Sequence, residues 1–192
     1  MDIYDIIDAK VVRYGEIVVC LFEHCNLKCV FCPQDHKSIL GASHDEIMTK
    51  VDPIVEWINN NPRKQSYKIH IMGGELFQDR WIEDGFIDTY EDFINAIDEQ
   101  TEADIYFNFI TNLCFDNVTE VMYFLARNDL KFSISYDPAG RFSKSDLDKF
   151  TRNIRYFQDY IEMVSLVATK QNIDKIIEGN QIFEALYHNY TC

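Results

Sequence analysis

The amino-acid sequence predicts an α/β fold in which parallel strands form a single domain. Five short apolar runs, rich in β-branched and aromatic residues, alternate with longer segments whose apolar residues recur at helical spacing. The chain has 192 residues, of which 47% are hydrophobic, and this suits one domain with a sizeable core. Successive strand–helix units imply a parallel sheet with right-handed crossovers.

The five apolar runs are the expected strands. The first has the length and β-branched content of a fully buried strand. The segment before it, residues 1–15, is an N-terminal extension of mixed pattern, and we expect residues 1–192 to form one domain. The expected strands cover residues 17–22, 67–72, 105–111, 131–136 and 162–168.

Capping residues and apolar stripes predict the helices between these strands. Ser43 and Glu46 fit a capping box, which predicts that a helix begins there. Asp52-Pro53 then predicts that this helix restarts or kinks at Pro53. Four further helices are expected. The first is capped near Asp88 or Thr89, and the second opens at Asn117. The third carries an apolar stripe from Leu147 to Ile161, and the last covers residues 172–187.

Charge and hydropathy exclude several classes of protein. The formal net charge of -14 argues against a general nucleic-acid binder, which needs an excess of Lys and Arg. No apolar segment approaches the roughly 20 residues that a membrane-spanning helix requires. The first residues lack the basic and apolar regions of a signal peptide. We therefore expect a cytoplasmic protein that does not bind membranes.

Three cysteines, Cys25, Cys29 and Cys32, lie on the loop that follows the first apolar run. Thiolates are soft ligands that select zinc or iron-sulfur clusters. Three thiolates hold three corners of a cubane cluster and leave one iron open, whereas an electron-transfer cluster is normally closed by four. An open iron indicates chemistry. Two other cysteines, Cys20 and Cys114, are expected to be small buried hydrophobes.

The spacing Cys25-x3-Cys29-x-Phe31-Cys32 resembles the cluster-binding motif of the radical S-adenosylmethionine (radical SAM) superfamily. A second match strengthens this resemblance, because Gly73-Gly74-Glu75 follows the second apolar run and is similar to the Gly-Gly-Glu element of the family. The resemblance extends thinly from Glu16 to about Ile173. It implies a partial (β/α) barrel of the radical SAM core type, and the five predicted strands are one short of the usual six.

The resemblance implies two cofactors, a [4Fe-4S] cluster held by the three cysteines and SAM bound to the fourth iron. It further implies that Gly73, Gly74 and Glu75 position the SAM amine and that Phe31 lies against the adenine. Ligand sites in barrels of parallel strands gather at the carboxyl ends of the strands. In the family, residues after strand three and within or after strand four contact the ribose and methionine parts of SAM, and by position the resemblance implies Asn112 and either Ser133 or Ser135 for these contacts. It further implies Lys170 as a partner for the SAM carboxylate.

The implied reaction begins when an electron donor such as flavodoxin or ferredoxin reduces the cluster. An electron then cleaves SAM, and the resulting 5'-deoxyadenosyl radical abstracts hydrogen from a substrate. Tyr136 and Cys114 lie near the same end of the predicted sheet, but the sequence assigns no catalytic residue.

The substrate class stays open at this stage. Residues 133–137 and 167–172 resemble the barrels of peptide- and protein-modifying radical SAM enzymes. A short chain with one cluster also resembles the activating enzymes that install a glycyl radical on a partner protein. A third alternative is a non-catalytic binding module, either for an iron-sulfur cluster or for zinc, with His24 completing a Cys3His set.

Overall fold

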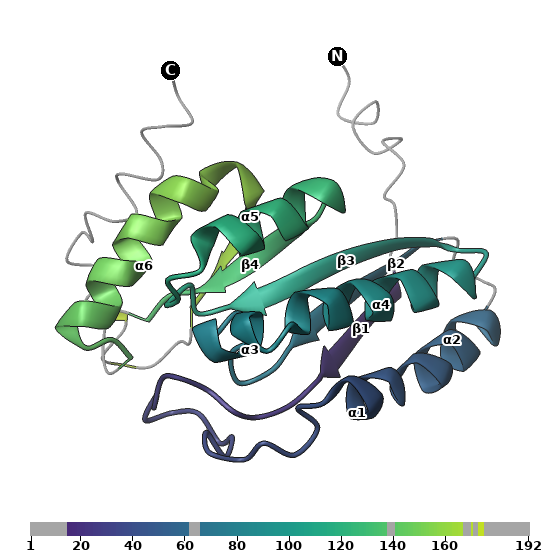
Figure 1. The fold of residues 1–192 in the computed structure, drawn as a ribbon, viewed down its shortest axis with the longest axis horizontal. Helices are drawn as coiled ribbons and strands as arrows, with labels where there is room; N and C mark the ends of the chain where they lie inside the picture. Colours follow the sequence, from purple (N-terminus) through teal and green to yellow (C-terminus); the bar gives the residue numbers. More distant parts are fainter. Residues whose placement is uncertain (1–14, 62–65, 138–140, 167–169, 171–172, 175–192) are drawn as a thin grey trace, which may run out of the picture.

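The structure, a computed structural model, describes residues 15–61, 66–137, 141–166, 170 and 173–174. Five parallel strands form one sheet, and their order in space is their order in sequence (Figure 1). This confirms the predicted parallel α/β class. The strands are β1 (Gly15–Cys20), β2 (Ser66–Met72), β3 (Asp104–Thr111), β4 (Lys131–Ser135) and β5 (Ile161–Ser165).

Six helices connect consecutive strands of the described sheet and lie over one of its faces (Figure 1). Right-handed crossovers between neighbouring parallel strands place every connecting helix on the same side. A 3-10 turn, η2 (Gln158–Tyr160), precedes β5. The helices are α1 (His44–Met48), α2 (Val51–Asn59), α3 (Asp79–Glu83), α4 (Phe86–Glu99), α5 (Val118–Arg127) and α6 (Lys144–Phe157).

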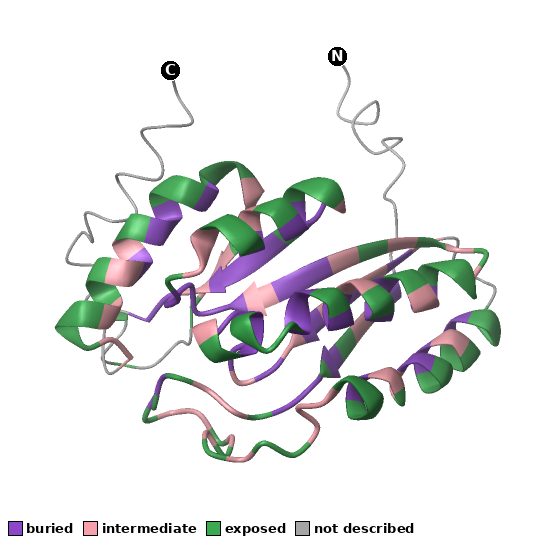
Figure 2. Ribbon diagram, in the orientation of Figure 1, coloured by how far each residue is buried: buried purple, intermediate pink, exposed green. Residues whose placement is uncertain are grey.

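The core lies between this face of the sheet and the helices (Figure 2). Phe77, on the loop between β2 and α3, is fully buried at its centre. Aromatic rings that pack against one another in tilted or edge-on orientations attract one another, in addition to the gain from burying apolar surface. The rings that surround Phe77 belong to Tyr90, Phe109, Phe115, Phe124 and Phe132, with centroids 5.7 to 6.3 Å away.

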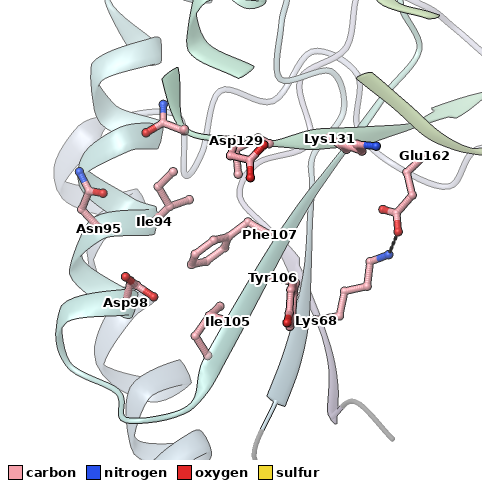
Figure 3. Close-up of a pocket in the computed structure, with 12 residues that line it drawn as sticks. Lys68, Ile94, Asn95, Asp98, Ile105, Tyr106, Phe107, Asp129, Lys131 and Glu162 are labelled. Carbon is pink, nitrogen blue, oxygen red and sulfur yellow. Dashed lines mark hydrogen bonds and ion pairs between the residues drawn. The ribbon is translucent and has the colours of Figure 1, made fainter. Parts of the chain in front are cut away.

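The opposite face of the sheet, which we call the open face, carries polar side chains. Ser133 donates a hydrogen bond to Asn108 Oδ1, and Asn108 donates one to Glu162 Oε2. Glu162 also pairs with Lys68, so the network spans β2 to β5. A hollow of about 530 Å³ lies beside this pair at the amino ends of the strands (Figure 3).

The first strand differs from its prediction. It ends at Cys20, and its burial alternates, with Val18 65% exposed and Cys20 exposed as well. The prediction of a fully buried strand was wrong because only the face bearing Val19 packs on the helices, and within the described residues nothing covers the face bearing Val18. Cys114, in contrast, is buried as expected.

Several helix boundaries also differ. Ser43 is confirmed as the N-cap of α1, but α2 begins at Val51, so Pro53 is its third residue. Proline is tolerated there because the first-turn N–H groups of a helix have no partner within it. The helix expected to be capped near Asp88 or Thr89 begins instead at Phe86, after Gly85 in the left-handed conformation.

At the end of the predicted apolar stripe, Ile161 starts β5 and is not part of α6. Asn117 is the N-cap of α5, although its side chain makes no capping bond. The predicted N-terminal extension and the helix over 172–187 lie outside the described residues, except for Gly15, Ile173 and Asp174. In the part of the chain that is described, no helix has the length and apolar character to cross a membrane.

Candidate functional site

A pocket of about 300 Å³ opens at the carboxyl ends of the strands. This is the edge at which ligand sites of parallel sheets gather. The loops after β1, β2, β3 and β4 all contribute to its wall. Among the residues singled out from the sequence, the structure brings together here Cys25, Cys29, Phe31, Cys32, Gly73, Gly74, Asn112 and Ser135.

Gly74 determines how closely the cysteine loop approaches the second strand. Its N–H donates to Phe22 O at 2.8 Å, and the next residue donates to His24 O at 3.0 Å. A Cβ at position 74 would lie 2.1 Å from Glu23 O and 2.2 Å from His24 O. Only glycine permits this contact between backbones, and the contact sets the cysteine loop beside the glycine pair.

The three cysteines are free thiols that line one wall of the pocket. Burial, together with the nearby Glu75 carboxylate, raises the pKa of the Cys25 thiol to about 12. Leu27 N–H lies 3.4 Å from Cys25 Sγ and donates to it. A thiol in such surroundings loses its proton when a metal binds, as is general for thiolate ligands.

The donor set consists of three soft thiols that open into one cavity. Within the described ranges, no three His, Cys, Asp or Glu side chains converge on a point that one ion would occupy. The thiolates of a cubane each bind a different iron, so they need only line a common cavity. His24, the fourth ligand of the zinc alternative, instead packs edge-on against Trp81, with ring centroids 5.3 Å apart.

Glu75 supports the pocket from beneath and is not among its lining residues. Its side chain is 1% exposed, and burial raises its pKa. Oε1 accepts hydrogen bonds from Phe77 N and Thr111 Oγ1, and Oε2 accepts one from Asn112 N at 2.5 Å. The carboxylate therefore holds the end of β3, while Gly73 and Gly74 line the pocket.

Two other residues implied by the resemblance lie apart from the pocket lining. Ser133 is buried on the open face, where it donates to Asn108 at 2.9 Å. Lys170 is exposed on a short described fragment of the chain. Neither side chain contributes to the described wall of the pocket.

Arg141 lines the pocket and was missed in the sequence. Its side chain is 9% exposed, pairs with Asp137 at 2.8 Å and donates to Ser135 O at 3.0 Å. Its guanidinium carbon lies 5.5 Å from the centre of the Phe31 ring. In the described part of the chain, Arg141 Nε is buried without a hydrogen-bond partner. Residues 137–140 resemble an ordinary turn, which masked the arginine that follows them.

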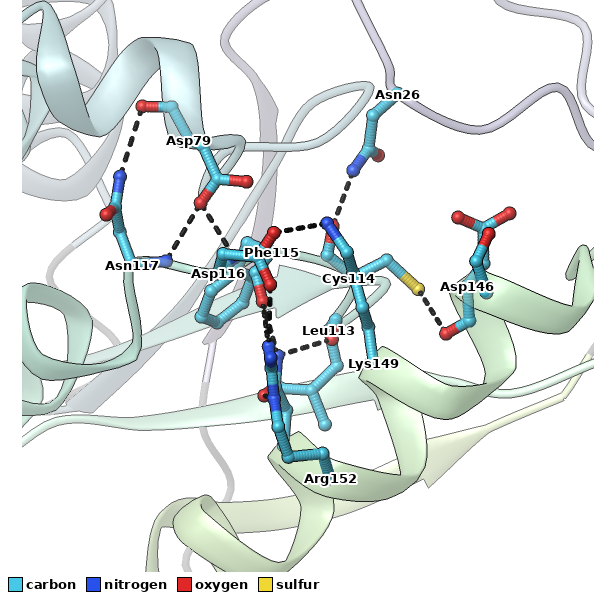
Figure 4. Close-up of polar contacts among 12 residues, drawn as sticks. Asn26, Asp79, Leu113, Cys114, Phe115, Asp116, Asn117, Asp146, Lys149 and Arg152 are labelled. Carbon is cyan, nitrogen blue, oxygen red and sulfur yellow. Dashed lines mark hydrogen bonds and ion pairs between the residues drawn. The ribbon is translucent and has the colours of Figure 1, made fainter.

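The loop after β3 is held in a strained conformation. Leu113 has a φ of 61°, which is rare for a side chain of its size. Asn153, on α6, donates to Leu113 O at 3.0 Å and to Phe115 O at 2.8 Å. Asp79 Oδ1 accepts from the backbone N–H groups of residues 116 and 117 (Figure 4). Strain that is held by its surroundings in this way is typical of functional sites.

Comparison with known proteins rests on solved structures, because no protein-family model and no curated protein matches the chain. His-tagged anSMEcpe with bound AdoMet (SAM) superposes with a TM-score of 0.66 and 17% identity over 90% of this chain. Native anSMEcpe with bound AdoMet superposes with a TM-score of 0.60 and 15% identity, also over 90%. Both are structures of an anaerobic sulfatase-maturating enzyme, a radical SAM enzyme. The fold is that of a radical SAM core.

A third radical SAM structure, native anSMEcpe with bound AdoMet and the Cp18Cys peptide, has a TM-score of 0.56 and 18% identity over 80% of this chain. The matched regions are 48% of the His-tagged chain, 49% of the native chain and 42% of the peptide-bound chain. The chain thus spans about half the length of these radical SAM enzymes. At such identities the likeness establishes the fold, and activity is a matter for proposal.

Proposed function

We propose that this protein is a radical SAM enzyme that cleaves SAM reductively and abstracts hydrogen from a substrate. One observation carries the proposal: three cysteines at the family's spacing and the glycine pair line a single pocket at the carboxyl ends of a radical SAM fold. Zinc does not account for the glycine pair. A structural role for the cysteines does not account for their opening into a cavity beside it.

Cys25, Cys29 and Cys32 would hold a [4Fe-4S] cluster, and the glycine pair would position SAM. When bound, the reduced cluster and SAM supply a 5'-deoxyadenosyl radical, and this chemistry belongs to the cofactors. The chain supplies binding geometry. Glycine at position 74 lets the backbone of the cysteine loop lie against the end of β2, so the proposed cluster ligands and the proposed SAM contacts line one pocket. Phe31 offers a flat apolar surface to the adenine.

Arg141 is our candidate for the SAM carboxylate, in place of Lys170. A buried guanidinium with an unpartnered Nε donor is suited to an anionic ligand, because charge-assisted hydrogen bonds are strong where water is excluded. Asp137 and Ser135 O orient the guanidinium from the other side. Asn112 and Ser135, which line the same pocket, remain proposed contacts of SAM.

The substrate class we favour is a peptide or protein, since one of the structural neighbours was solved with a peptide. The electron donor would be a flavodoxin or ferredoxin, and the compartment the cytoplasm. A glycyl-radical activating role is the alternative within the same chemistry. Incubation with a candidate partner protein and detection of a glycyl radical would favour that alternative.

The first experiment is anaerobic reconstitution with iron and sulfide, followed by metal counting and electron paramagnetic resonance (EPR) of the reduced protein. We expect about four irons per chain, an EPR signal that changes when SAM is added, and release of 5'-deoxyadenosine. The Cys29→Ala variant should lose the cluster. Bound zinc, or a cluster indifferent to SAM, would make the chain a binding module and remove the catalytic proposal.

Arg141→Gln tests the carboxylate contact. We expect the variant to keep its iron and to bind SAM about tenfold or more weakly, since a hydrogen bond to a charged group contributes roughly 1.5–3 kcal/mol. Arg155→Gln, at an exposed position of α6, is the matched control and should bind SAM as the wild type does. Equal affinity in both variants would exclude Arg141 from the site.

A further inference from the structure

The side-chain amides of Asn26 and Asn112 form a network that ends at a proposed cluster ligand. Asn26 Nδ2 donates to Cys114 O at 2.7 Å (Figure 4). Asn112 Oδ1 accepts from Cys114 N at 2.8 Å. Asn112 Nδ2 then lies 2.8 Å from Asn26 Oδ1 and 3.7 Å from Cys25 Sγ. The two asparagines are 86 positions apart in the chain.

This network leaves no freedom in the orientation of either amide. Cys114 N is a donor, so the atom of Asn112 that faces it must be the carbonyl oxygen. Cys114 O is an acceptor, so the atom of Asn26 that faces it must be the amide nitrogen. Asn112 therefore directs its NH2 group toward the cysteine loop, with one hydrogen for Asn26 Oδ1 and the other for Cys25 Sγ.

The backbone of Asn112 is held just as firmly. Glu75 Oε2 accepts from Asn112 N, and Asn112 as a whole residue is 6% exposed. Water therefore has little access to replace the amide hydrogen that faces the sulfur. Leu27 N is a second donor to the same sulfur, but a backbone group is unaffected by substitution. Asn112 provides the donor that a mutation can remove.

We propose that Asn112 donates an N–H···S hydrogen bond to the Cys25 thiolate and thereby raises the reduction potential of the cluster. The proposal rests on the function proposed above. A reduced cluster carries one more negative charge than an oxidised cluster, so its sulfurs are better acceptors and a fixed donor stabilises the reduced form more. Hydrogen bonds to the sulfurs and the exclusion of solvent are established determinants of cluster potentials. In a dry site each such bond is stronger than in water.

This assignment makes Asn112 a positioning and tuning residue as well as a proposed contact of SAM. A purely structural role would be shared with Asn26, because both amides tie the cysteine loop to the end of β3. Of these two side-chain amides, that of Asn112 donates to the sulfur, whereas the oxygen of Asn26 faces it. The two roles therefore make different predictions for the two residues.

The test is an EPR-monitored redox titration of the full chain, reconstituted with iron and sulfide and without SAM. We expect Asn112→Ala to keep its four irons and to have a lower midpoint potential than the wild type. Asn26→Ala, the matched control, should lose folding stability to a similar degree but keep the wild-type potential. An unchanged potential in Asn112→Ala, or an equal fall in both variants, would overturn the tuning role.

A measurement on the unsubstituted sequence keeps the proposal testable if Asn112→Ala does not fold. Protein carrying asparagine labelled with 15N at the side-chain amide is reduced, and weak 15N hyperfine coupling to the cluster is sought by pulsed EPR. We expect coupling that persists in Asn26→Ala, and its absence would overturn the proposal. A wild type that assembles no four-iron cluster would contradict the proposed function. A cluster that assembles but has the same potential in Asn112→Ala would contradict only the tuning role.

Discussion

At the scale of single residues, the candidate site depends on two backbone features that a side chain would disturb. Gly74 lies under the carbonyl oxygens of Glu23 and His24, within the distance at which a Cβ would overlap them. Leu113, buried on the loop after β3, holds a left-handed conformation against its own steric preference. Hydrogen bonds with distant parts of the chain hold both positions, because Gly74 N donates to Phe22 O and Asn153 on α6 donates to Leu113 O.

Gly74→Ala should therefore lower the free energy of unfolding by about 3 kcal/mol, toward the upper end for overpacked sites. The reason is that both clashing atoms are backbone atoms, which cannot rotate away. The same variant should retain less iron after reconstitution, because the cysteine loop is displaced. Urea denaturation and metal counting measure the two effects.

Gly85→Ala is the control for this prediction. Gly85 has a φ of 82°, but nothing lies within 4 Å of a Cβ built there. Only conformational strain of roughly 1–2 kcal/mol is expected, with iron content unchanged. Equal iron loss in both variants would mean that general destabilisation, and not the position of the cysteine loop, controls the cluster.

At the scale of elements, short contacts between helices complement the core. The ring of His44, the first residue of α1, lies 3.3 Å from the Asp45 carboxylate and 3.2 Å from that of Asp92 on α4. Hydrogen bonds to these two carboxylates raise the pKa of His44 above its ordinary value of 6.5. The ring is largely exposed, so solvent screens the interaction and its effect on stability is small.

The pH dependence of this contact has a definite sign. Because the folded-state pKa is raised, the stabilising effect is fully present below pH 6.5 and is lost as the pH rises through the folded-state pKa. NMR titration of the His44 ring should give a value above 6.5 in the wild type and a lower one in Asp92→Asn. Asp88→Asn, at an exposed position of the same helix, should leave the value as in the wild type.

At the scale of the whole molecule, one sheet and one core join every described strand and helix. The five strands are hydrogen-bonded in sequence order, and the rings around Phe77 come from β3, β4, α4, α5 and the loop after β3. This continuity is the basis for expecting a single domain. The net charge of -14 opposes compaction, and the core must outweigh that repulsion.

A single domain should unfold in one cooperative transition. The chain has two tryptophans, Trp57 on α2 near the first edge of the sheet and Trp81 on α3 in the buried core. Fluorescence of Trp57→Phe, which reports on Trp81, should give the same denaturation midpoint as circular dichroism of that variant. The same should hold for Trp81→Phe. Midpoints that separate within either variant would indicate two independently folding units.

Much of this protein follows from local patterns in its sequence. The alternation of strands and helices, the cysteine spacing and the position of the glycine pair each lie within a few consecutive residues. Pattern and spacing therefore predicted the parallel α/β class, and the expected carboxyl-end edge holds eight of the residues named from the sequence. Short-range steric and capping preferences determine such features, and the sequence displays them directly.

Tertiary structure decided what lies against each side chain. Periodicity does not reveal that nothing described covers Val18 at an edge strand, or that Glu75 faces the end of β3 and not the cavity. The placement of Arg141 beside Phe31 and of Asn112 beside Cys25 depends on loops that are far apart in the chain. Such contacts form only when the sheet brings its carboxyl ends together, and no local rule encodes them.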